Sequence, residues 1–260
     1  MSDGADNKTL LRVSDVSVRF DGLMANDSVD LEVRRGEVTA LIGPNGAGKT
    51  TLFNVITGAQ RPTSGNVWFN GRDITGLNRV ARARLGIART YQNLSLVSDL
   101  SALDNVTIGL GQFRQAGPLS SMLALPRARR QDRNIRRLAA RALAFVGLDP
   151  GTEAGDLPYG DRRRLELARA LVQAPRLLLL DEPSAGMDAA ETAELAGLIR
   201  KSSEHLGVTV LVVEHDMSFV RELAQRTTVL EFGRVIARGT TSKVLRNPTV
   251  IAAYLGTRTA

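Results

Sequence analysis

Cysteine is missing from this 260-residue sequence, which excludes disulfide bonds and thiol catalysis. Long hydrophobic runs are missing as well: the most apolar stretches, at 177–180 and 208–213, have the length of strands, whereas a membrane-spanning helix needs about 18 residues. The first six residues are acidic and polar, so we expect no signal peptide there. A hydrophobic content of 43% and a charged content of 23% are ordinary for a globular protein.

Lysine is also scarce, because thirty of the 34 basic residues are arginine, and the formal net charge is +7. So strong a preference for arginine over lysine partly reflects overall amino-acid composition rather than a specific function. The charge is therefore weak evidence for nucleic-acid binding, and we expect no nucleic-acid partner. Seven arginines gather between Arg127 and Arg141. They predict either a solvated helix face or a surface that lies near anionic lipid head groups or a membrane partner.

What the sequence does contain is a phosphate-binding pattern at residues 43–50: glycine, four residues, then Gly-Lys-Thr. Backbone N–H groups can close around phosphate oxygens there, because glycine side chains neither block the approach nor restrict φ. The lysine places a charge between the outer phosphates, and the threonine hydroxyl can bind Mg²⁺. The candidate nucleotide-binding residues are Gly43, Pro44, Asn45, Gly46, Ala47, Gly48, Lys49, Thr50 and Thr51.

The surroundings of this loop agree with that interpretation. Residues 38–42 are mostly apolar and predict a buried strand, and residues 50–58 predict a helix whose positive N-terminal end points at the anion. Phe20 precedes the loop and could stack on an adenine ring, although a core position is an equally good interpretation of a lone aromatic residue.

A pair of carboxylates follows another buried strand. Residues 177–180 are four leucines, which predicts a strand covered on both faces, and Asp181 and Glu182 come directly after them. Ligands of open α/β sheets bind at the carboxyl ends of strands, so the pair and the phosphate loop should share one edge. Asp181 would then hold Mg²⁺, and Glu182 would deprotonate the water that attacks the γ-phosphate. A helix cap or plain surface charge is the alternative for such a pair.

The remaining patterns predict an α/β fold with an antiparallel layer and a helical insertion. Near-alternation of apolar residues predicts the layer, and helical periods without strands begin at residue 101 and end at residue 147. An amphipathic helix, a buried strand and a hairpin are expected after the insertion. The layer should use residues 11–13, 16–20, 29–33 and 66–70, and the later elements should span 162–173, 208–213 and 228–237.

These motifs resemble the ATP-binding subunits of ATP-binding-cassette (ABC) transporters, because they occur in that family's order. After the phosphate loop come the Q-loop glutamine Gln92, a signature at 157–161, the strand ending at Glu182, a D-loop at 184–188 and the switch histidine His215. The family's fold is a P-loop NTPase (RecA-like) core with an antiparallel β layer and an inserted α-helical subdomain. The resemblance covers residues 10–256 as one domain. It implies 10–92 and 174–240 for the core and layer, 93–173 for the helical subdomain and 241–256 for short C-terminal helices.

The resemblance implies hydrolysis of ATP with Mg²⁺. Gln92 would sense Mg²⁺ and the γ-phosphate, and His215 would hold the attacking water beside Glu182. The Mg²⁺ ligands would be Thr50, Gln92 and Asp181. The signature would complete the ATP site of a second subunit, so the catalytic unit would be a dimer. The signature residues are Pro158, Tyr159, Gly160 and Asp161, and the D-loop residue is Asp188.

The resemblance also implies the partners and the location. The first partner is a second, homologous ATPase subunit, with which this chain would form a heterodimer. The other partners are two transmembrane permeases and an extracytoplasmic solute-binding protein. The chain would lie at the cytoplasmic face of the inner membrane, attached through the permeases.

The signature departs from the usual Leu-Ser-Gly-Gly-Gln of the family. Pro158 has neither a serine hydroxyl nor a backbone N–H, so two hydrogen-bond donors are missing and we expect weaker closure of that composite site. Tyr-Gly-Asp at 159–161, Glu-His-Asp-Met at 214–217 and the ending at 247–256 resemble the ATPases of branched-chain amino-acid importers. The alternatives are an importer of urea, amides or other small solutes, an exporter of lipid or lipopolysaccharide, and a soluble ABC ATPase of DNA repair or translation.

Overall fold

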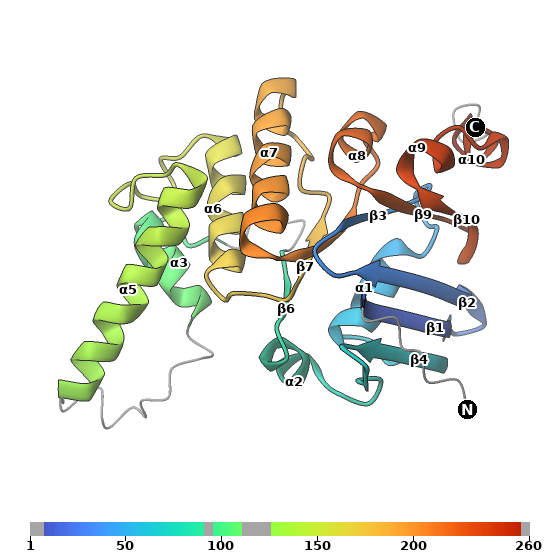
Figure 1. Ribbon diagram of the computed structural model, residues 1–260, viewed down its shortest axis with the longest axis horizontal. Coiled ribbons are helices and arrows are strands. Elements are labelled where there is room, and N and C mark those ends of the chain that lie inside the picture. The colour runs from blue at the N-terminus through green and yellow to red at the C-terminus, as the bar shows by residue number, and fades with distance from the viewer. Residues whose placement is uncertain (1–7, 91–95, 111–125, 256–260) are drawn as a thin grey trace.

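A six-stranded, mostly parallel sheet forms the centre of the molecule (Figure 1). The computed structural model describes residues 8–90, 96–110 and 126–255. The strand order is β10-β9-β3-β8-β7-β6, and only β10 runs antiparallel to its neighbour. The strands are β3 (Val38–Ile42), β6 (Ile87–Arg89), β7 (Leu177–Asp181), β8 (Thr209–Val213), β9 (Arg226–Glu231) and β10 (Arg234–Thr240).

The three central strands end at the same level. Val213, the last residue of β8, stands opposite Leu41 of β3 on one side and Asp181 of β7 on the other. Because these strands are parallel, the segments that follow them leave the sheet at one edge. The expectation that the phosphate loop and the two carboxylates share an edge is therefore met by the topology.

Both faces of these strands are buried, as four consecutive leucines predict. Leu178 and Leu180 face the core formed with helices α6, α7 and α8, whereas Leu177 and Leu179 face the core formed with α1 and the second sheet. The layers are visible in Figure 1, where α7 and α8 lie on one side of the sheet and α1 on the other. These helices are α1 (Lys49–Thr57), α6 (Tyr159–Leu171), α7 (Ala189–Leu206) and α8 (Met217–Leu223).

The second sheet is antiparallel, as expected, with the order β2-β1-β4-β5. Residues 11–13 and 16–20, which show the predicted near-alternation, belong to a single strand, β1. Asp15 adopts a left-handed φ of 50° between them, and the register shifts there, so an irregularity interrupts the alternation without ending the strand. The strands are β1 (Thr9–Phe20), β2 (Leu23–Arg34), β4 (Ser64–Phe69) and β5 (Arg72–Asp73).

A group of helices, α3 (Ala102–Gly109), α5 (Pro126–Val146) and α6, packs together at one end of the molecule (Figure 1). The arginines of α5 whose side chains are described lie on its exposed side, and Arg136 pairs with Asp104 at 3.3 Å. The start of α6 differs from the prediction. The helix begins at Tyr159 instead of Arg162, because Pro158 is its N-cap and the signature forms its first turn.

Three short helices complete the described chain: α2 (Arg79–Arg84), α9 (Thr241–Val244) and α10 (Pro248–Leu255). Pro248 is the first residue of α10, a position that suits its fixed φ and missing N–H. Within the three described ranges, no helix combines the length and the apolar character that crossing a membrane requires.

Arg82 of α2 holds the C-terminal end of α1. Its side chain is 1% exposed, and its guanidinium donates to the carbonyl oxygens of Val55 and Ile56 at 2.6 and 2.8 Å and to those of Leu77 and Thr75 at 3.0 Å each. Burial lowers the pKa of Arg82 to about 10, so the group remains charged at neutral pH. A cation at this end complements the helix dipole, whose positive end faces the phosphate loop.

Replacing Arg82 with methionine should lower the free energy of unfolding by about 2–4 kcal/mol, because several buried carbonyl groups lose a charged donor. Urea unfolding followed by circular dichroism measures this loss. Arg84→Met is the matched control, since Arg84 lies on the same short helix with an exposed side chain, and it should change stability by less than about 0.5 kcal/mol. Equal losses in both variants would contradict the assignment.

Candidate functional site

The phosphate loop connects β3 to α1, and its tip at Asn45 and Gly46 is exposed. Two glycines of the loop, Gly43 and Gly48, have close backbone neighbours that leave no room for a side chain, which the sequence alone did not reveal. A Cβ on Gly43 would lie 2.1 Å from the Leu230 carbonyl oxygen, and a Cβ on Gly48 would lie 2.3 Å from the Ala25 carbonyl oxygen. The loop is therefore packed backbone to backbone against β9 and β2, which fixes it before any phosphate arrives.

Lys49, the first residue of α1, is 7% exposed and folds back over the loop. Its Nζ donates to the carbonyl oxygens of Gly43 and Pro44 at 2.7 and 2.8 Å. Burial lowers the pKa of Lys49, and the negative charges of Glu182 and Asp181 partly offset this effect. The lysine thus lies within electrostatic reach of both carboxylates, as a site for a negatively charged ligand between them requires.

Asp181 and Glu182 lie at and after the end of β7, as predicted, but they differ in surroundings. Asp181 is buried and forms an ion pair with Arg89, with Nη2 and Oδ2 2.8 Å apart. Arg89 also donates to Asn54 Oδ1 at 2.7 Å and stacks over the Phe53 ring of α1. Arg89 therefore ties the carboxyl ends of β6 and β7 to the helix of the phosphate loop. No local sequence pattern indicates this role, although Arg89 directly precedes the stretch that leads to Gln92.

Glu182 directly follows the last residue of β7. Its φ is 47°, a left-handed value that is uncommon for a residue with a side chain and typical of strained functional positions. Glu182 Oε1 lies 3.9 Å from Nδ1 of His215, which is 59% exposed. The loops after β7 and β8 therefore bring the predicted base and the predicted switch histidine together.

Glu214 is a second residue of this site that the sequence prediction missed. It separates the end of β8 from His215, its side chain is 0% exposed, and its carboxylate contacts both Ser184 and His215. The available signal was the one used for Asp181 and Glu182, a carboxylate directly after an apolar strand.

The signature segment contacts the D-loop of its own chain. Tyr159 donates its hydroxyl to the carbonyl oxygen of Ala185 at 2.9 Å, and Arg163 donates to the same hydroxyl at 2.8 Å. Pro158 caps α6 without a side-chain hydrogen bond, and Asp161 pairs with Arg164. Gly160 is buried against the side chain of Glu191 in the first turn of α7.

Of three further predicted residues, Asp188 and Phe20 are described by the structure and Gln92 is not. Asp188 accepts a hydrogen bond from the Glu191 backbone at 2.9 Å and forms a capping box that begins α7, so it has at least a structural role. Phe20 is 44% exposed at the β1–β2 hairpin, which leaves a face for stacking. Asn26 of the same hairpin donates to the Gly48 carbonyl at 3.2 Å. Gln92 lies outside the described residues.

The oxygen ligands at this edge of the sheet fit Mg²⁺ in the presence of a nucleotide. Thr50 lies exposed in the first turn of α1, and Asp181 provides a carboxylate of which Arg89 holds one oxygen. The described ranges contain no cluster of three or more His, Asp or Glu residues that could bind a metal by itself. Such a cluster is unnecessary, because Mg²⁺ keeps several waters and takes phosphate oxygens beside one or two protein ligands.

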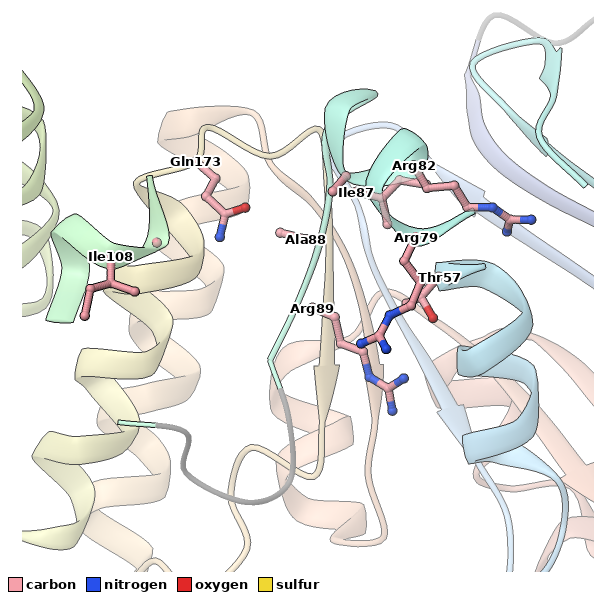
Figure 2. A pocket seen from close by; sticks show the side chains of 10 residues that line it. Thr57, Arg79, Arg82, Ile87, Ala88, Arg89, Ile108 and Gln173 are labelled. Atoms are coloured by element: carbon pink, nitrogen blue, oxygen red, sulfur yellow. The ribbon is translucent and has the colours of Figure 1, made fainter. Parts of the chain in front are cut away.

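A cavity of about 320 Å³ lies beside the site, between the sheet and the helical group. Figure 2 shows Arg79, Arg82 and Arg89 on one side and Ile108 and Gln173 on the other, with Ala88 of β6 between them. Arg89 lines this cavity and also pairs with Asp181. Arg89 therefore connects the wall of this cavity to Asp181.

Comparison with known proteins agrees with this geometry. A family model described as "ABC transporter" matches residues 26–185, and one described as "Branched-chain amino acid ATP-binding cassette transporter" matches residues 234–260. The "High-affinity branched-chain amino acid transport ATP-binding protein LivG" of Escherichia coli is 40% identical over 252 residues, which cover 96% of this chain and 99% of LivG. The protein BraF of Pseudomonas aeruginosa, of the same description, shares the same identity and coverage.

Solved structures give the same result. The crystal structure of the ADP conformation of MJ1267, an ATP-binding cassette of an ABC transporter, has a TM-score of 0.84 and 30% sequence identity, and the match covers 95% of this chain and 99% of that one. The phosphate loop, the carboxylate pair and the histidine thus lie in a fold that ATP-binding cassettes share. The chain belongs to the ABC transporter family, as one of its ATP-hydrolysing, nucleotide-binding subunits.

Proposed function

We propose that this subunit powers an importer of branched-chain amino acids. The observation that carries the proposal is the similarity to LivG and BraF over nearly the whole chain, together with the match of residues 234–260 to the branched-chain amino acid family. The signature Tyr-Gly-Asp and the ending after Asn247, which resemble those importers, support it as well.

At the site, some groups would bind the triphosphate and others would activate the water that attacks it. The N–H groups of residues 43–50 and the positive end of α1 would bind the phosphates, with Lys49 between the outer two. Glu182 would take the proton of the attacking water, and His215 would orient that water and contact the γ-phosphate. Their separation of 3.9 Å and the low exposure of Lys49 support this division of roles.

Mg²⁺ would neutralise charge on the outer phosphates when it is bound with ATP. Thr50 and Asp181 would hold it, together with Gln92. Phe20 would stack on the adenine. The ion pair with Arg89 keeps Asp181 fixed at the end of β7, where these functions meet.

Two subunits would form the working unit, with Pro158 to Asp161 of each covering the ATP of the other. In such a transporter the partner would be a homologous ATPase, and two permeases and an extracytoplasmic binding protein would complete the assembly at the cytoplasmic face of the membrane. The single ABC domain at 10–256 would divide as the family does, with a helical subdomain at 93–173 that moves the permeases. Arg89 lines the cavity between that region and the sheet and also pairs with Asp181, which supports a mechanical link between the nucleotide site and the permeases.

Glu182→Gln should bind ATP and accumulate as a closed dimer while turnover falls by about 10²–10⁴-fold, the size of a general acid–base contribution. Phosphate release and size-exclusion chromatography measure the two effects. Glu204→Gln removes an exposed carboxylate on α7 and should leave both unchanged. Undiminished hydrolysis in Glu182→Gln would remove this residue from the mechanism.

Lys49→Ala should weaken ATP binding by about 10- to 100-fold, since one charge-assisted hydrogen bond is worth about 1.5–3 kcal/mol. Calorimetric titration measures the affinity, with the exposed Lys201→Ala as the control. In the unchanged protein, burial lowers the pKa of Lys49 and the triphosphate would raise it. Binding should therefore be strongest below the pKa of the free protein and weaken as the pH rises through it, with proton uptake in that window. Unchanged affinity in Lys49→Ala would contradict this role.

Pro158→Ser should strengthen ATP-dependent dimerisation and raise turnover, because it restores a backbone N–H and a hydroxyl at the start of α6. Pro158→Ala restores the N–H alone and should give a smaller gain. A serine N-cap also stabilises the helix by about 1 kcal/mol, so the unfolding of each monomer is measured separately. No gain in dimerisation or turnover would show that the proline does not limit closure.

A further inference from the structure

The carboxylate of Glu214 lies between the two segments that carry Glu182 and His215. Glu214 directly follows β8, and its side chain is 0% exposed. The turn after β7 lies next to it, since β7 and β8 are neighbours and the Glu182 N–H donates to the Val213 carbonyl at 2.9 Å.

One carboxylate oxygen of Glu214 holds the turn after β7. Oε1 accepts from the backbone N–H of Ser184 at 2.9 Å and from its hydroxyl at 2.6 Å. Ser184 is 8% exposed and follows Glu182 by two residues, with the rigid Pro183 between them. A displacement of Ser184 would therefore carry Glu182 with it.

The other oxygen holds the histidine segment. Oε2 accepts from the His215 N–H at 3.0 Å and lies 3.5 Å from the Asp216 nitrogen. Asp216 in turn caps α8, accepting from Ser218 and Phe219. One carboxylate thus joins two loops whose functional side chains lie 3.9 Å apart.

We propose that Glu214 is a positioning residue, which fixes the distance between Glu182 and His215 by bonding to the backbone of both loops. This inference rests on the roles proposed above for those two residues. A carboxylate suits the position because it provides two acceptor oxygens to a group of donors. It also acts within a buried region, where such charge-assisted hydrogen bonds are short and strong.

Glutamine at this position would keep the shape but not the function. Its amide NH₂ is a donor, and in either orientation it would face a backbone N–H, of Ser184 or of His215. One of the two loops would then lose its acceptor and shift. A displacement of about 1 Å in a catalytic group can cost about 100-fold in rate.

The test compares Glu214→Gln and Ser184→Ala in the full chain by steady-state ATP hydrolysis, ATP binding and thermal unfolding. Glu214→Gln should lower kcat by about 10- to 100-fold and change the affinity for ATP by less than about threefold, because the phosphate loop is not touched. Ser184→Ala removes one donor of two and should lower kcat less. Ser203→Ala is the matched control, since its buried hydroxyl donates to the Gly36 carbonyl at the opposite end of β3.

A double-mutant cycle separates positioning from a general loss of stability. In a His215→Ala background, Glu214→Gln should reduce kcat by less than about threefold further. Without the imidazole, the distance between Glu182 and residue 215 that Glu214 fixes no longer affects the rate. Equal effects of Glu214→Gln with and without His215 would overturn the proposal. If Glu214→Gln does not fold, Ser184→Ala takes its place in the cycle and the same criterion applies.

The failure of this inference differs from the failure of the proposed function. If Glu182→Gln abolishes hydrolysis while Glu214→Gln retains full kcat, Glu214 has no positioning role and the mechanism is unaffected. If Glu182→Gln retains hydrolysis, the proposed mechanism itself is wrong.

Discussion

The burial of β3, β7 and β8 on both faces is the constraint on which the site depends. A strand covered on both sides has almost no place for a charged side chain, so charged groups gather where the strands end. Because the three strands end level, three groups lie at one edge: the loop after β3, the pair Asp181 and Glu182 at the end of β7, and Glu214 and His215 after β8. The position of the chemistry is thus a consequence of the packing of the core.

This edge is held from several directions before any nucleotide binds. The phosphate loop packs against the backbones of β2 and β9, and Lys49 folds onto its carbonyl groups. Arg82 satisfies the far end of α1, while Arg89 links Asp181 to the same helix. Rigid support of this kind lowers the reorganisation that binding and catalysis would otherwise require. The left-handed Glu182 shows that the support is sufficient to keep one residue in a strained conformation.

The sequence predicted the elements that carry the site, because burial and glycine spacing leave local patterns. The strand at 38–42 lies where it was expected. The four-leucine strand predicted at 177–180, the helix predicted at 50–58 and the hairpin predicted at 228–237 are all present, with ends that differ by a few residues. The start of α6 was missed, since a proline looks like a helix boundary in sequence. Arg89 and Glu214 were missed for another reason. Their importance comes from contacts between segments far apart in the chain, which no local pattern records.

The contact between Tyr159 and Ala185 bears on how the unusual signature works. Pro158 gives α6 no side-chain cap, which alone would leave the start of the helix weakly defined. Tyr159 compensates by bonding to the D-loop backbone, with Arg163 against its hydroxyl and its ring. Because α6 is anchored in this way, in the proposed dimer the missing serine would remove donors to the partner's phosphate without loosening the helix that presents them. The same bond joins the segment that would face the partner's ATP to the turn that follows Glu182, so a change at one of the two sites in a dimer would be felt at the other.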